Sequence, residues 1–334
     1  MFKRPGSRLF PRRGLSRFAD AISLFLAALG VSAFAGDDSP PGTGGKESGR
    51  VVTVTAVKGD EHNWIVALNP AASGWEKIVP SGSHARLSPD GTTLAFGIDT
   101  GLWTCPLKLG ARPTHVGEIG NPEAMRLLTS AKVAWTPDGK TIIATGARGT
   151  FPQLTFETLR FDLRSKGGTK LPVPGTDIIE DISPDGRWLL TSRTRGLDSP
   201  QGLFRMRLDG TGGVRLTRGG AFAGRFSPDG SKILYGSTGV EAENEGLFLV
   251  DADGSNRRRL HPSPALACWS PDGKRIAFTG TPTAPVRFDN AEKAPPAKDN
   301  SRFVGSVVLI GIDGKNRVVH PTPTGGIAFQ PDWR

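Results

Sequence analysis

Cysteine is scarce in this chain, and Cys105 and Cys268 are its only two copies among 334 residues. A disulfide framework of the kind that stabilises small secreted domains is therefore excluded. The wide separation of the two gives no reason to pair them, so we expect two small buried side chains. Long segments of helical periodicity are also missing after residue 50, whereas 44 glycines and 27 prolines favour many turns.

Residues that carry chemistry are equally sparse. The five histidines show no close metal-ligand spacing and stand at His62, His84, His115, His261 and His320. His84 precedes an expected inner strand and is the one candidate to face a central channel. No G-x-S-x-G nucleophile elbow is present. The sequence therefore indicates no catalytic residue, no cofactor-binding residue and no metal ligand, and we expect no cofactor.

The surplus of positive charge does not indicate a nucleic-acid partner. About half of the formal net charge of +10 comes from the first 35 residues. The basic run Arg257-Arg258-Arg259 has no interleaved aromatic residues on which bases would stack. We therefore expect a protein or peptide partner and no nucleic acid.

The first 50 residues are typical of an export signal followed by a linker. A basic stretch ends at Arg17, an apolar run extends from Ala21 to Ala35, and residues 33–35 read Ala-Phe-Ala. This pattern predicts a signal peptide over residues 1–35, cleavage after Ala35, and a periplasmic or extracellular protein without a stable membrane span. An uncleaved anchor remains an alternative. The pair Arg12-Arg13 leaves the twin-arginine route open beside the general secretory one. Residues 36–50, rich in Gly, Pro, Ser and charge, predict a flexible linker.

One phrase, Ser/Thr-Pro-Asp-Gly, returns from residue 85 onward. Five complete copies have prolines 43 to 48 residues apart, a period typical of propeller blades or helical arrays. Each copy predicts a tight turn, because Pro presets φ, Ser and Asp accept local hydrogen bonds, and Gly adopts a left-handed conformation. The structural turn residues are Pro89, Asp90, Gly91, Pro137, Asp138, Gly139, Pro184, Asp185, Gly186, Pro228, Asp229, Gly230, Pro271, Asp272 and Gly273. One carboxylate per turn is too few for a calcium loop.

The residues around each turn predict strands. An apolar residue precedes each copy, namely Leu87, Trp135, Ile182, Phe226 and Trp269, and a short β-rich run follows it. A second hairpin with an Asp-Gly turn follows in the later units, for example at Asp209 and Asp253. Each repeat therefore contains four antiparallel strands, which is one propeller blade.

The two ends of the repeat region predict how a ring closes. Gln330-Pro331-Asp332-Trp333 looks like a sixth copy of the turn, preceded by one strand whose last apolar residue is Phe329. Three strands expected at 51–57, 63–69 and 75–81 precede the first complete copy. We therefore predict an all-β, six-bladed β-propeller over residues 51–334, in which one C-terminal strand joins three N-terminal strands. We expect it to be monomeric.

The repeated phrase and the apolar strand after it resemble the PD40 (WD40-like) repeat of TolB-like propellers, over residues 51–334. The TolB proteins of this family carry an α/β domain before the propeller, whereas here a short linker precedes residue 51. The resemblance therefore extends to the propeller alone and does not imply docking to the Tol–Pal envelope system. Propellers host unrelated activities, so a channel-mouth enzyme such as a carbohydrate lyase stays as the alternative to a non-catalytic binding scaffold.

Loops of variable length opposite the turns are the predicted recognition surface. The longest runs over residues 281–303 and is polar and rich in proline. The candidate partner-binding rim consists of Arg193, Arg195, Glu241, Glu243, Glu245 and Arg287.

Overall fold

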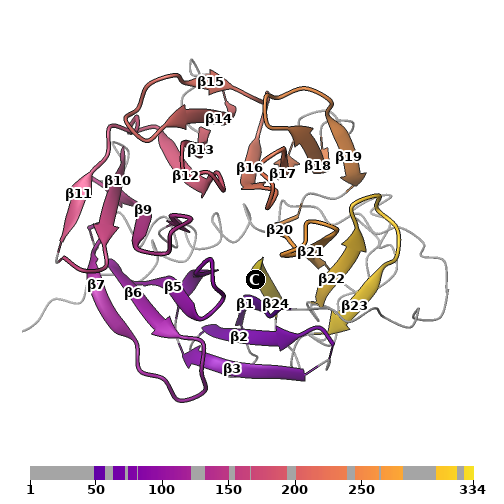
Figure 1. Ribbon diagram of the computed structural model, residues 1–334, viewed down its shortest axis with the longest axis horizontal. Helices are drawn as coiled ribbons and strands as arrows, with labels where there is room; N and C mark the ends of the chain where they lie inside the picture. The colour runs from indigo at the N-terminus through magenta and orange to yellow at the C-terminus, as the bar shows by residue number, and fades with distance from the viewer. Residues whose placement is uncertain are drawn as a thin grey trace, which may run out of the picture.

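The computed structural model describes residues 49–56, 63–71, 74–80, 82–121, 132–149, 155–165, 167–193, 201–238, 245–262, 265–280, 306–321 and 327–334. These ranges contain 24 strands and no helix. The strands form six four-stranded antiparallel sheets arranged around a common centre (Figure 1). The predicted six-bladed β-propeller is therefore confirmed.

The six sheets are named blades 1 to 6 in the order of their innermost strands. Blade 1 consists of β4 (Ser83–Leu87), β5 (Thr93–Ile98), β6 (Gly101–Pro106) and β7 (Thr114–Glu118). Blade 2 consists of β8 (Lys132–Trp135), β9 (Thr141–Arg148), β10 (Thr155–Asp162) and β11 (Gly168–Lys170). Blade 3 consists of β12 (Asp177–Ile182), β13 (Trp188–Arg193), β14 (Gly202–Arg207) and β15 (Val214–Arg215).

The second half of the ring repeats this plan. Blade 4 consists of β16 (Ala221–Phe226), β17 (Lys232–Thr238), β18 (Glu245–Asp251) and β19 (Arg258–His261). Blade 5 consists of β20 (Ala267–Trp269), β21 (Arg275–Gly280), β22 (Ser306–Gly311) and β23 (Val318–Pro321). Blade 6 joins β24 (Ile327–Trp333) to β1 (Val51–Ala56), β2 (Asn63–Asn69) and β3 (Gly74–Pro80).

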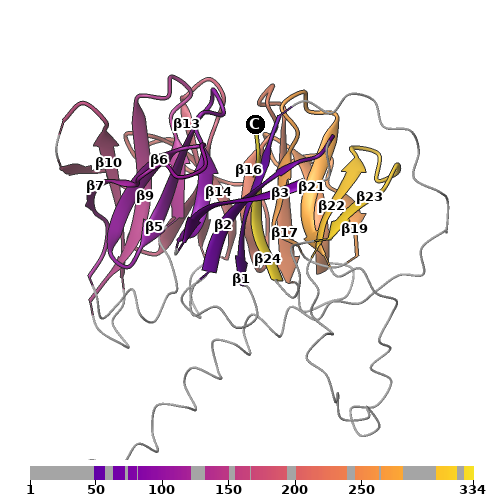
Figure 2. The ribbon, with the colours of Figure 1, turned by 90° about the horizontal axis from the view of Figure 1, so that it is seen from below.

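The Pro-Asp-Gly turns have the geometry that their residues predict. In the first copy, Gly91 N donates to Ser88 O at 2.8 Å, and Gly91 has φ +71°. Thr92 N donates to Asp90 Oδ1 and Thr93 N donates to Ser88 Oγ. The turn face is the side of the ring on which these turns lie, and the C-terminal end of β24 reaches the same side, at the top of Figure 2.

Ring closure occurs by a pairing of β1 with β24, which places Val51 opposite Trp333 and Val52 opposite Asp332. Arg50 N donates to Arg334 O at 2.7 Å. Closure by the C-terminal strand is thus confirmed, but Gln330–Trp333 does not form a sixth turn, because these residues lie inside β24. Trp333, and not Phe329, occupies the position that Leu87 holds in blade 1. Trp333 pairs with Val51 of its blade's second strand, just as Leu87 pairs with Leu94.

The hydrophobic core is divided among the blade interfaces. Six clusters of buried side chains occur in the described residues, and each joins two neighbouring blades. In the cluster between blades 6 and 1, Val54 and Ile65 pack with Leu87 and Phe96. Each blade therefore buries both faces against its neighbours, and the ring needs all six interfaces. No helical segment with the length and apolar character of a membrane crossing occurs in the described ranges.

Candidate functional site

Leu87 and its counterparts in the other five blades are the apolar residues at which the innermost strands end. The residue immediately before each of them lies at the centre of the ring. We call these six positions the hub, and they are Arg86, Ala134, Asp181, Arg225, Cys268 and Asp332. They share one register, because each pairs with the equivalent residue of its blade's second strand. Four of the six are charged, namely two arginines and two aspartates. Burial of charge is unfavourable unless the charges are paired, so their contacts decide what the centre of the ring can do.

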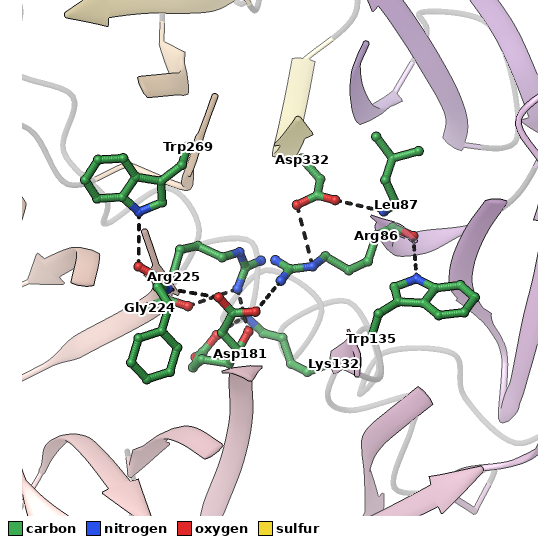
Figure 3. Close-up of polar contacts among 11 residues, drawn as sticks. Arg86, Leu87, Lys132, Trp135, Asp181, Gly224, Arg225, Trp269 and Asp332 are labelled. Carbon is green, nitrogen blue, oxygen red and sulfur yellow. Dashed lines mark hydrogen bonds and ion pairs between the residues drawn. The ribbon is translucent and has the colours of Figure 1, made fainter. Parts of the chain in front are cut away.

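Arg86 pairs with both hub carboxylates across the ring, whereas Arg225 donates to main-chain oxygens (Figure 3). Arg86 Nη2 donates to Asp181 Oδ1 at 2.7 Å, and Arg86 Nε lies 3.6 Å from Asp332 Oδ1. Arg225 Nη1 donates to the main-chain oxygens of Glu180 at 2.6 Å and Gly224 at 3.1 Å. Side chains from blades 1, 3, 4 and 6 therefore meet at one level in the centre of the ring, although Arg86 Nη1 and Arg225 Nε are buried without a hydrogen-bond partner among the described residues.

The hub also connects neighbouring blades, namely blade 6 to blade 1 and blade 3 to blade 4. Asp332 Oδ2 accepts the Leu87 N–H at 2.8 Å, and Asp181 Oδ2 accepts the Phe226 N–H at 2.9 Å. The Trp135 indole N–H donates to Arg86 O. A buried carboxylate that accepts main-chain N–H groups is held in one position.

The hub pattern repeats after three blades. Blades 1 and 4 contribute the hub arginines Arg86 and Arg225, and blades 3 and 6 contribute the hub aspartates Asp181 and Asp332. In blades 2 and 5 the residue after the hub position is a tryptophan, Trp135 or Trp269. The Trp269 indole donates to Arg225 O at 3.2 Å, just as Trp135 donates to Arg86 O at 3.1 Å. The centre therefore has an approximate two-fold arrangement within a six-bladed ring.

A second layer of charge lies beside the hub. Lys132 Nζ contacts Glu180 Oε2 at 3.1 Å, and Ser192 Oγ donates to Glu180 Oε1 at 2.7 Å. The Glu180 side chain is 2% exposed. With the hub, this layer gives three cations and three carboxylates, so the centre is neutral overall.

The pKa values of these groups reflect burial and the neighbouring charges. Burial lowers the pKa of His84, and the cations Lys132, Arg225 and Arg86 lower it further. His84 lies in a bulge of β4 with φ +52°, two residues before Arg86. His84 therefore lies near the charged groups at the centre of the ring. Because its pKa is lowered, its imidazole is neutral near neutral pH.

Both cysteines are buried, as expected. Burial raises the pKa of the Cys268 thiol at the hub and also that of Cys105. Neither thiol is therefore a thiolate near neutral pH, and neither has the character of a nucleophile.

Two of the six predicted rim residues lie in the described ranges. Arg193 ends β13 and forms a bidentate pair with the buried carboxylate of Asp177, at 2.6 and 2.9 Å. Its guanidinium also lies over the Phe204 ring, so it is engaged within its own blade. Glu245 begins β18 and is half-buried. Arg195, Glu241, Glu243 and Arg287 lie outside the described residues.

The hub carboxylates and arginines were absent from the sequence-based candidates. Their signal lies one residue before the aligned apolar residues, where Arg86, Asp181 and Arg225 place a charge at the same position of the inner strand. A charge at a buried strand position, with a charge of opposite sign at the same position of another repeat, indicates a central ion pair.

The fold and its charged centre define a closed six-bladed β-propeller with a filled channel. Its fold is TolB-like. It is similar to TolB of Acinetobacter baumannii with a TM-score of 0.66 and 18% identity, over 86% of this chain and 67% of that one. It is also similar to a protein from Agrobacterium tumefaciens assigned as TolB, with a TM-score of 0.57 and 17% identity, over 86% of this chain and 99% of that one.

Other solved propellers share the fold. An oligogalacturonate lyase of Vibrio parahaemolyticus matches with a TM-score of 0.50 and 11% identity, over 77% of this chain and 71% of that one. No protein-family model matches the sequence, and no curated protein matches it either. At these identities the similarities establish the fold alone.

Proposed function

We propose that this chain is an exported, non-catalytic propeller that binds a protein or a peptide. The observation that supports this function is the filled centre. Arg86, Asp181, Arg225 and Asp332 bond to one another or to the main chain, so they position blades and do not point into an open site. A rigid ring with a filled channel offers its two faces and its outer edge for recognition.

A carbohydrate lyase at the channel mouth is the less favoured function. Histidines and carboxylates clustered in the channel would support such an enzyme. In the part of the chain that the structure describes, no three His, Cys, Asp or Glu side chains are placed so that they could hold a metal ion together. His84 is surrounded by Lys132, Arg86 and Arg225, and their positive field opposes a divalent cation there.

Export and the recognition surface belong to the same proposal. Residues 1–35 act as the signal peptide and residues 36–50 as the linker to the propeller. The partner binds the rim opposite the turn face, which includes Glu245 and the loop at 281–303. Because this loop is the longest between two strands of one blade, we propose that it determines which partner binds.

The experiment compares the intact chain with a variant that lacks residues 284–300. Both proteins are used for affinity capture from the envelope extract of the source cells. A protein captured by the intact chain is then purified and titrated against both forms. We expect the deletion to weaken its binding at least tenfold, while the urea midpoint of the propeller stays the same. Equal affinity of the two forms would refute the rim proposal, and the absence of any reproducible captured protein would refute the binding function.

A further inference from the structure

Two depressions on the turn face have the same construction. The first, about 280 Å³, lies between blades 1 and 2 and is lined by Trp135, Pro89 and Pro137 together with Asp90 and Asp138. The second, about 160 Å³, lies between blades 4 and 5 and is lined by Trp269, Pro228, Asp229 and Asp272. Leu163 completes the first depression and Ile312 the second. An apolar floor thus combines with two carboxylates in each depression.

The two depressions are equivalent positions of the ring. Trp135 and Trp269 each directly precede a turn, and each donates its indole N–H to the main chain of a hub arginine. Blades 1 and 4 are three blades apart in a ring of six, so the depressions lie half a turn from each other (Figure 1). They repeat the approximate two-fold arrangement of the hub on the molecular surface.

The carboxylates retain hydrogen-bonding capacity toward a ligand. In Asp90, Asp138 and Asp272 the turn hydrogen bonds end on Oδ1, which leaves Oδ2 for a partner. Side-chain hydroxyls such as Ser88 lower the pKa of these carboxyls and so keep them ionised.

The charge around each depression is negative. Lys232 lines the second depression, but it contacts Asp251 at 2.7 Å. Lys140 and Lys274, each two residues after a turn aspartate, offset one of the two carboxylates at each site. About one net negative charge per depression remains. A ligand with an apolar stem and a positive end matches these walls, which describes an arginine or lysine side chain.

We propose that the two depressions are equivalent docking sites for arginine or lysine side chains of a polypeptide partner, half a turn apart on the turn face. This inference goes beyond the proposed rim site, because it assigns a second recognition surface on the opposite face of the ring and states the chemistry of the segment that binds there. A partner with two basic anchors would gain from engaging both sites at once.

The test uses the full chain with ¹⁵N-labelled tryptophan and hexa-arginine as the probe. Hexa-citrulline, which has nearly the same shape without the charge, is the matched control. The indole resonances are assigned with Trp135→Phe and Trp269→Phe. We expect hexa-arginine to shift the signals of Trp135 and Trp269. The signal of Trp188 should stay in place, because its ring already contacts Arg205 and Arg207.

Paired substitutions separate the two sites. Asp90→Asn with Asp138→Asn should weaken binding at Trp135 by about threefold to tenfold, as two exposed charge pairs predict, and should leave Trp269 unchanged. Asp229→Asn with Asp272→Asn should do the reverse. Asn keeps the Oδ1 acceptor of the turn, and the urea midpoint verifies folding. Asp185→Asn is the control in blade 3, because its Oδ2 already pairs with Arg187 at 2.8 Å.

The inference is overturned if hexa-citrulline shifts the two signals as much as hexa-arginine, or if neither pair of substitutions weakens binding. This result is independent of the rim experiment. An intact hexa-arginine response with no captured partner would refute the proposed function alone. A captured partner whose hexa-arginine response is missing would refute this inference alone.

Discussion

Replacing Asp332 with alanine tests whether the hub stabilises the closed ring. The Asp332 residue is 3% exposed, and its carboxylate accepts the Leu87 N–H at 2.8 Å and lies 3.6 Å from Arg86 Nε. Loss of the acceptor leaves a buried N–H unsatisfied, at a cost of about 1–3 kcal/mol. Breaking an isolated buried ion pair costs about 3–5 kcal/mol, but Arg86 keeps Asp181 at 2.7 Å. We therefore expect Asp332→Ala to lower the free energy of unfolding by about 3–4 kcal/mol, within the range of these two effects.

Urea denaturation followed by tryptophan fluorescence measures this loss. Asp332→Asn should be intermediate, because it keeps an acceptor for Leu87 N–H and loses only the charge. Glu76→Ala is the matched control in the same blade, since Glu76 pairs with Arg50 at 3.2 Å while its side chain is 53% exposed. Such an exposed pair contributes about 0–1 kcal/mol. An Asp332→Ala variant as stable as Glu76→Ala would refute the role of the hub.

Three further predictions concern buried groups. Because the pKa of His84 is lowered in the fold, the unfolded chain takes up that proton first, so stability is lost as pH falls below about 6.5. His84→Asn, which tolerates the positive φ, should reduce the slope of the urea midpoint between pH 7 and pH 5, and an unchanged slope would contradict this. Cys105 and Cys268 should react with a maleimide only in urea, and rapid labelling of the native protein would show that the thiols are accessible. A Cβ at Gly146 would lie 1.6 Å from Ile119 O, whereas one at Gly213 meets nothing within 4 Å. Gly146→Ala should therefore destabilise the protein by at least about 2 kcal/mol and Gly213→Ala hardly at all, and equal urea midpoints would contradict the packing.

The turns and strands were predictable because local residues determine them. In the turn Ser88–Gly91, every hydrogen bond joins residues at most five positions apart. The phrase therefore carries its own geometry wherever it recurs. The alternation of turn and strand then predicts four-stranded blades, and the three unmatched N-terminal strands predict closure with β24.

The sixth turn was predicted incorrectly because a Pro-Asp pair can also lie inside an extended strand. Gln330-Pro331-Asp332 lacks the glycine that supplies the left-handed residue in the other five copies. Without it the chain stays extended, and Asp332 takes the hub position opposite Val52. The missing glycine was the available signal.

The hub pairing could not be predicted from the sequence. A pairing of Arg86 with Asp181 depends on the separation of blades 1 and 3 across the ring, and not on their distance along the chain. The charges of Arg86, Asp181 and Arg225 at one position of the repeat are visible in the sequence. Which charge meets which depends on the radius of the closed ring. The predicted rim stays a prediction, since four of its six residues lie outside the described ranges.

The strand pairing that closes the ring also sets an order on folding. Every other ladder joins strands that follow one another in the chain, whereas β1 must wait for β24 from the opposite end. Local hairpins form quickly, and a single contact of such long sequence separation forms slowly. Until then the backbone groups along one side of β1 are open to a strand of another molecule. Refolding yield should consequently fall as protein concentration rises, with β1 as the point where neighbouring chains associate.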